Sequence, residues 1–127
     1  MEKITGNVEK ISKTEFYMLD DAEIVIIAYG LPARVSYRVV NEARKEGIKA
    51  GLLRLVTIWP FPYARVKKVI ANAKAIVMPE MNFGLMAGEV ERVKKLEIPL
   101  YKVPKIAQLH EPGEILAAVK RAKEAIA

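Results

Sequence analysis

Few side chains in this sequence could take part in chemistry, and they are widely spaced. His110 is the only histidine, so no second imidazole can join it at a metal. Its place before Pro112 favours a role in a loop or a helix cap over catalysis. Arg54 interrupts an apolar run, and Glu80 and Asn82 follow another. We expect Arg54 to pair with an acid, Glu80 first, although ligand binding by the arginine stays open. Asn82 fits a capping role in the loop equally well.

Sequence motifs for cofactor binding are incomplete or absent. Gly30-Leu31-Pro32 follows the run EIVIIAY at the point where a dinucleotide fold would place G-x-G-x-x-G, but the second and third glycines are missing. No Walker sequence occurs. The absence of cysteine excludes disulfides, thiol nucleophiles, zinc–thiolate sites and an iron–sulfur cluster ligated by this chain. We therefore expect no catalytic, cofactor-binding or metal-ligating residue here, and no enzyme activity from the chain alone.

Alternating apolar runs and amphipathic stretches must position these side chains. The run 50–58 ends at Pro60 and Pro62, which enclose the aromatic pair Trp59 and Phe61 in a stiff loop. Strands are expected at 15–19, 23–29, 50–58, 75–78 and 99–103, and helices at 33–46, 63–73, 85–96 and from 112 onward. This alternation predicts right-handed βαβ crossovers and an α/β fold with a mainly parallel sheet covered on both faces.

The overall composition sets limits on partners and location. The 127 residues fit one domain, no apolar run approaches the ~20 residues of a membrane span, and the N-terminus lacks a signal-peptide core, so we expect a cytoplasmic protein. The net charge of +6 indicates either a lysine-rich surface or an acidic partner, such as an acidic subunit or a phosphate-bearing cofactor. Basic residues interleaved with glutamate disfavour nucleic acid. Abundant lysine and glutamate without cysteine are typical of a heat-adapted, thermophile-like composition.

Four stretches carry a resemblance to a known family. They are AEIVIIAYGLPAR (22–34), EARKEGIKAGLLRLVTIWPFP (42–62), PEMNFG (79–84) and EPGEILAAV near the end. The chain resembles, from about Glu15 onward, the α subunit of 2-oxoacid:ferredoxin oxidoreductases, in the core domain II that is similar to the transketolase C-terminal domain. The resemblance implies a three-layer α/β/α fold with a five-stranded, mostly parallel sheet. Its first strand would be antiparallel, and strand 24–29 would lie between strands 50–55 and 75–79.

The same resemblance implies where the domain begins in this chain and which functions belong to other parts of the enzyme. Residues 1–127 would form a single domain, with 1–14 an N-terminal helix or linker and 15–127 the transketolase C-terminal-like part. The chain would be a non-catalytic domain, excised or gene-split, of an enzyme that oxidatively decarboxylates pyruvate, 2-oxoglutarate or a related 2-oxoacid with coenzyme A. Thiamine diphosphate, magnesium and the iron–sulfur cluster would belong to the parent complex. The implied partners are its other subunits or a second copy, with ferredoxin an indirect one.

The expected functional surface is the carboxyl edge of the sheet, where open α/β folds bind ligands and partners at the switch point. The residues proposed for this edge, as interface or switch-point residues, are Tyr29, Gly30, Arg34, Arg54, Trp59, Phe61, Glu80, Asn82 and Gly84. Trp59 and Phe61 would either dock a partner or cover the core. The rival hypothesis is a free-standing domain that binds a phosphate or nucleotide at the same loops, and a third is a nucleic-acid module.

Overall fold

The computed structural model describes residues 14–55, 63–80, 89–90, 92, 94, 98–104 and 112–126. Within these ranges the elements are β1 (Thr14–Tyr17), β2 (Ile24–Tyr29), α2 (Gly30–Lys45), β3 (Ala50–Leu55), α3 (Tyr63–Ile70), β4 (Ala75–Glu80), β5 (Leu100–Pro104) and α5 (Pro112–Ile126). Not one of the helices in these ranges has a stretch long and apolar enough to cross a bilayer.

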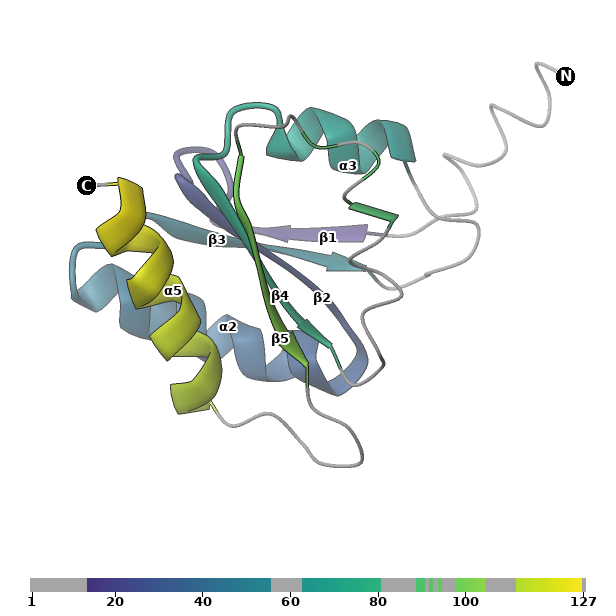
Figure 1. Cartoon of the computed structure of the whole chain (residues 1–127). Helices are drawn as coiled ribbons and strands as arrows, with labels where there is room; N and C mark the ends of the chain where they lie inside the picture. The colour runs from purple at the N-terminus through teal and green to yellow at the C-terminus, as the bar shows by residue number, and fades with distance from the viewer. Residues whose placement is uncertain are drawn as a thin grey trace, which may run out of the picture.

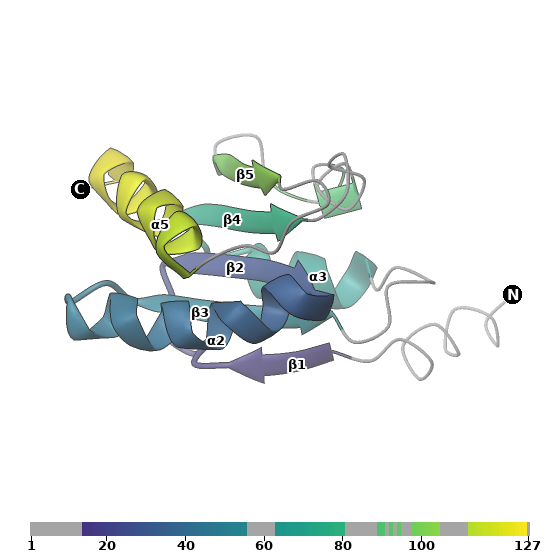
Figure 2. The same ribbon diagram turned by 90° about the horizontal axis from the view of Figure 1, so that it is seen from below.

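The five strands form one sheet in the order β1-β3-β2-β4-β5. Strand β1 lies at one edge and runs antiparallel to β3, while the pairs β2–β3, β2–β4 and β4–β5 are parallel. Helices α2 and α5 cover one face of the sheet and α3 lies on the other, as Figures 1 and 2 show. The expected three-layer, transketolase C-terminal-like architecture is therefore confirmed, including the antiparallel first strand and the central place of β2.

The continuous apolar runs are explained by burial on both faces of the sheet. Along β2, Ile24, Ile26 and Ala28 point into the core under α2 and α5, and Val25 and Ile27 point into the core under α3. All five of these side chains are at most 2% exposed. A strand with one solvated face would have alternated polar and apolar residues, so a run without alternation already indicates the middle of the sheet.

Several element bounds differ from the expected ones. Helix α2 begins at Gly30 instead of residue 33, because a proline is tolerated in the first turn, where its missing N–H has no partner to lose. Helix α3 ends at Ile70, and β4 extends to Glu80. The expected N-terminal helix or linker, the end of the strand at 56–58 and most of the helix at 85–96 lie outside the described residues. The division of the chain at residues 14 and 15 stays a prediction.

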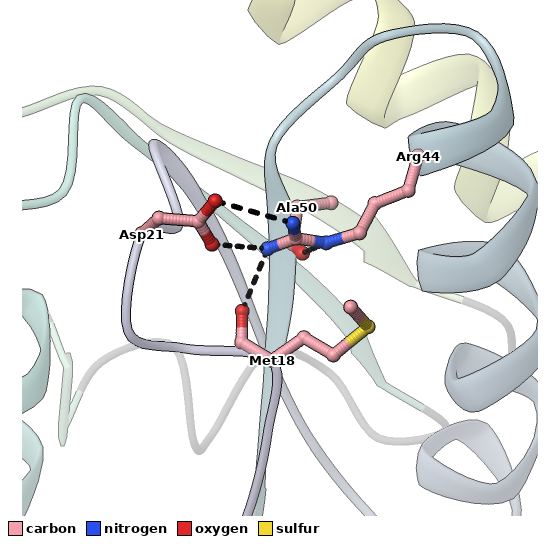
Figure 3. Close-up of polar contacts among 4 residues, drawn as sticks. All are labelled: Met18, Asp21, Arg44 and Ala50. Carbon is pink, nitrogen blue, oxygen red and sulfur yellow. Dashed lines mark hydrogen bonds and ion pairs between the residues drawn. The ribbon is translucent and has the colours of Figure 1, made fainter.

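The connection between β1 and β2 is held to the rest of the fold by Arg44, in the last turn of α2 (Figure 3). The Arg44 guanidinium donates from Nε to the Ala50 carbonyl oxygen (2.9 Å) and from Nη2 to the Met18 carbonyl oxygen (2.8 Å). The same Nη2 lies 2.7 Å from Oδ1 of Asp21. Met18 has a φ of 55°, an uncommon value for a residue with a side chain. The arginine therefore fixes a strained turn against the start of β3.

Gly51 supplies the space into which this connection settles. A Cβ placed on Gly51 would lie 2.7 Å from the Met18 carbonyl oxygen, 2.8 Å from the Leu19 side chain and 2.9 Å from the Ala22 side chain. These distances are shorter than any non-bonded carbon contact allows. The backbone of β3 can therefore approach residues 18–22 only where it carries a glycine.

Candidate functional site

The switch point of the sheet lies between β2 and β4. Helix α2 connects β2 to β3, which lies on one side of β2 in the sheet. Strand β4 lies on the other side of β2, and the strand that follows it in the chain, β5, lies further out on that side. The backbone ladder between β2 and β4 runs from Ile24–Ala75 to Ile26–Val77 and ends there, although both strands continue for three residues. Open α/β sheets bind ligands and partners at the carboxyl ends of the strands, at the point where the strand order reverses.

Tyr29 ends β2 and Gly30 begins α2, so both lie at this edge of the sheet, while their functional role stays a prediction. Tyr29 is the N-cap of α2, with extended backbone angles (φ −139°, ψ 161°) and no side-chain capping hydrogen bond, and the first turn of α2 has no acidic residue. The Tyr29 ring packs on the core under α3. The first N–H groups of α2 give this end a partial positive charge that can attract an anion. Arg34, one turn further, is exposed.

Arg54 lies one residue before the carboxyl end of β3 and pairs with an acid, but with a different acid from the one expected. Its Nη1 is 2.9 Å from Oε1 of Glu15 on β1. The antiparallel register places Glu15 opposite Arg54, whereas Glu80 belongs to β4, two strands or about 9.5 Å from β3. The Arg54 side chain is 29% exposed, and its buried Nε has no hydrogen-bond partner within the described part of the chain.

Glu15 and Tyr17 belong to a polar and aromatic cluster that the sequence did not reveal. The Tyr37 hydroxyl donates to Oε1 of Glu15 (3.4 Å), and the Tyr17 hydroxyl donates to Oδ1 of Asn41 (2.7 Å). The Tyr17 and Tyr37 rings meet edge to face, with centroids 5.2 Å apart. A signal was present: Glu15 and Tyr17 alternate along a strand, and Tyr37 and Asn41 are four apart on a helix. Their pairing depends on the position of β1, which local sequence does not give.

The remaining proposed residues are placed only in part. The backbone of Glu80 lies at the end of β4, on the same edge as Tyr29, while its side chain is outside the described part. Trp59, Phe61, Asn82 and Gly84 also lie outside the described residues. The structure thus brings Tyr29, Gly30 and the end of β4 to one edge. The roles of the four residues outside the described part stay predictions.

Tyr63, at the start of α3, forms a further polar contact. The Tyr63 hydroxyl donates to Oε2 of Glu89, and this hydrogen bond to a carboxylate raises the pKa of the Tyr63 phenol above its ordinary value. A phenol with a raised pKa stays protonated near neutral pH, so Tyr63 acts as a hydrogen-bond donor and not as a base. The contact ties the start of α3 to residue 89 on the same side of the sheet.

The chain offers few ligands for a metal ion or an iron–sulfur cluster in the part that the structure describes. Among them, no three histidine, aspartate or glutamate side chains come close enough together to hold a metal ion. The whole sequence has no cysteine to ligate an iron–sulfur cluster. What the arrangement offers is a set of surfaces: an edge at the switch point and the flanks of an edge strand.

Comparison with known proteins points to one family. Residues 22–122 match the family described as "Pyruvate:ferredoxin oxidoreductase core domain II". The chain is 42% identical over 120 residues to the 2-oxoglutarate synthase subunit KorA of Methanocaldococcus jannaschii, covering 94% of this chain and 32% of that subunit. It is 39% identical over 90 residues to the ketoisovalerate oxidoreductase subunit VorB of Methanothermobacter marburgensis. That match covers 71% of this chain and 26% of the VorB subunit.

Solved structures show the same fold. A 2-oxoglutarate:ferredoxin oxidoreductase from Magnetococcus marinus, with 2-oxoglutarate, coenzyme A and succinyl-CoA bound, superposes with a TM-score of 0.80 at 21% identity, over 94% of this chain and 21% of that one. An inactive β4 tetramer of a split-gene transketolase superposes with a TM-score of 0.68 at 19% identity. That match covers 85% of this chain and 41% of the transketolase chain. This chain spans about a third of the length of its KorA-type relatives.

Proposed function

Because this chain belongs to the pyruvate:ferredoxin oxidoreductase core domain II family, we propose that it is a non-catalytic packing domain, or split subunit, of a 2-oxoacid:ferredoxin oxidoreductase. The parent complex would oxidatively decarboxylate a 2-oxoacid with coenzyme A and pass the electrons to ferredoxin. The supporting observation is how much of each chain the match covers. The family match extends over residues 22–122 of this chain, yet the chain covers only 31–32% of the length of the KorA-type subunits.

The catalytic cofactors are assigned to the rest of that complex. Thiamine diphosphate, magnesium and the iron–sulfur cluster would be held by partner domains, since the described residues offer no cluster of metal-ligating side chains and the sequence has no cysteine. The relatives are named for 2-oxoglutarate and ketoisovalerate, which favours the 2-oxoacids as the substrate class.

The carboxyl edge of the sheet is proposed as a docking face for the neighbouring domains or for a second copy. Tyr29, Gly30 and the end of β4 lie at this edge, and Trp59 and Phe61 follow in the sequence a few residues after β3, whose carboxyl end is at the same edge. Large aromatic side chains in stiff loops bury much area with little loss of entropy, and they are enriched in interface hot spots.

Replacing Phe61 by alanine tests this docking role. We expect the Phe61→Ala variant to assemble less well with the partner subunits while losing little thermal stability, as measured by sedimentation of the complex and by the melting temperature of the free chain. Unchanged assembly together with a large drop in melting temperature would assign the aromatic loop to the core instead.

The rival function, a free-standing phosphate or nucleotide binder, is supported by the start of α2 at the switch point, which has no side-chain capping hydrogen bond, and by the net charge of +6. Calorimetric titration of the isolated chain with inorganic phosphate and with a nucleoside triphosphate distinguishes the rival function from the packing role. Saturable binding at low millimolar concentration or below, combined with no assembly with oxidoreductase subunits, would replace the packing role by the rival.

A further inference from the structure

The two faces of the edge strand β1 have different surroundings. Tyr17, on one face, is covered by α2 through the contacts of its ring with Tyr37 and of its hydroxyl with Asn41. Phe16 points to the opposite face, the side of α3, and is 57% exposed. An exposed phenylalanine on an edge strand is a liability that soluble domains usually avoid, unless something covers it.

A groove of about 660 Å³ lies beside Phe16, between the β1–β2 connection and α3. Its apolar lining includes Phe16 from β1, Leu19 from the connection and Val69 from α3, and Asp20, Arg65 and Lys68 add charge. The groove runs along α3 from Ala64 and reaches Asn72, two residues beyond the end of the helix. It lies along the β1 side of the sheet, so it is separate from the switch point between β2 and β4.

The charges of the groove favour an acidic occupant. Helix α3 contains three cationic side chains and no acidic one, and two of the three, Arg65 and Lys68, line the groove. Arg65 also donates from Nη1 to Oγ1 of Thr14 (3.1 Å), which keeps the guanidinium on this side of β1. Asp20 is the one acid among the described residues of the lining. The wall formed by α3 is therefore positive, within a chain of net charge +6.

We propose that this groove docks an amphipathic polypeptide segment with an acidic edge, supplied by the part of the oxidoreductase that this chain lacks. The inference rests on the proposed function: about two thirds of the length of the KorA-type subunits lies outside this chain and must pack on it somewhere. The apolar side of the segment covers Phe16, Leu19 and Val69, and its acidic edge faces Arg65 and Lys68. The outer backbone of β1 offers further hydrogen bonds to the same segment.

A pair of charge reversals on neighbouring residues tests the electrostatic part. Lys67 and Lys68 are both exposed on α3, but only Lys68 lines the groove. In the assembled complex we expect Lys68→Glu to weaken binding of this chain roughly tenfold, chiefly through a slower association, and Lys67→Glu to change it less than about twofold. Equal effects of the two reversals, or none from Lys68→Glu, would overturn the proposal.

Cysteine labelling identifies the occupant, because the natural chain has no cysteine. Ala64→Cys, in the groove, should react with a maleimide in the free chain and be protected in the complex. Ala117→Cys, exposed on α5 across the sheet, should react in both. A benzophenone attached at Ala64→Cys should crosslink to one acidic segment of a partner subunit. A crosslink to a second copy or within the same chain would overturn the proposal.

The outcomes also separate this proposal from the proposed function. If the unmodified chain forms no complex with oxidoreductase subunits, the packing role itself fails. If the complex forms but the cysteine at residue 64 stays reactive, the packing role stands and the groove is not the docking site.

Discussion

Arg44 is the residue on which the placement of the β1–β2 connection depends most. Its guanidinium, 21% exposed, joins the end of α2 to the carbonyl oxygens of Met18 and Ala50 and to the carboxylate of Asp21. Hydrogen bonds from a charged donor are worth about 1.5–3 kcal/mol when their loss leaves buried partners unpaired. A lysine in this place could not reach all three acceptors with one rigid group.

We expect Arg44→Ala to lower the free energy of unfolding by about 2–3 kcal/mol. Lys45→Ala is the matched control: Lys45 is the next residue, is exposed and makes a 3.6 Å ion pair with Glu42, so its loss should cost less than about 0.5 kcal/mol. Urea unfolding followed by circular dichroism measures both values. Equal losses for the two variants would show that the Arg44 contacts contribute little.

The pH dependence of stability should carry the signature of the same contact. The hydrogen bond from Arg44 holds the pKa of Asp21 below its ordinary value, and one from Lys74 does the same for Glu23. Because the pKa of each of these two carboxyl groups is lower in the folded chain than in the unfolded chain, each binds its proton more tightly when the chain is unfolded. The stabilisation is therefore complete above the ordinary carboxyl pKa of about 4 and is lost as the pH falls below it.

We expect the unfolding midpoint of the natural chain to fall as the pH is lowered through this range, and to fall less steeply in Asp21→Asn. Urea titrations at a series of pH values on the acid side of neutrality measure the two slopes. Parallel pH curves for the two proteins would contradict the assigned role of Asp21.

At the scale of elements, the sequence and the family resemblance predicted all five strands, including the antiparallel first strand, but not the residue-by-residue register of β1 against β3. Runs such as 24–29 have no polar alternation, and this pattern by itself indicates burial on both faces. The partner of Arg54 could not be predicted, since it depends on the antiparallel register of β1, a strand of four residues. Helix α2 begins three residues earlier than expected because Pro32, which suggests a break, fits into the first turn of the helix.

The close approach of β3 to the β1–β2 connection gives a prediction about two glycines. Gly51→Ala should destabilise the fold by about 1–3 kcal/mol, because the new Cβ would meet the Met18 carbonyl oxygen at 2.7 Å. Gly113→Ala, in the first turn of α5 with nothing within 4 Å, should be neutral or stabilising by up to about 1 kcal/mol. Thermal unfolding compares them. A neutral Gly51→Ala would mean that residues 18–22 move aside at little cost.

At the scale of the whole molecule, the described residues form one five-stranded sheet with its helices, and the chain spans about a third of the length of its KorA-type relatives. Its fold and family could be predicted because strongly periodic segments and the stretch around residues 50–62 carry both. The positions of the partner surfaces could not, because a docking face is defined by what covers it. Phe16, ordinary in the sequence, becomes informative only once it is found exposed beside a groove.

The most direct test of the packing role is ferredoxin reduction by the reconstituted complex. Oxidoreductase subunits carrying thiamine diphosphate and the iron–sulfur cluster are mixed with ferredoxin, coenzyme A and 2-oxoglutarate, ketoisovalerate or pyruvate, with and without this chain. We expect no reduction by the chain alone, little by the other subunits alone, and reduction dependent on 2-oxoacid and coenzyme A once they are combined. Full activity of the other subunits without this chain, or a failure of the chain to bind them, would contradict the proposal.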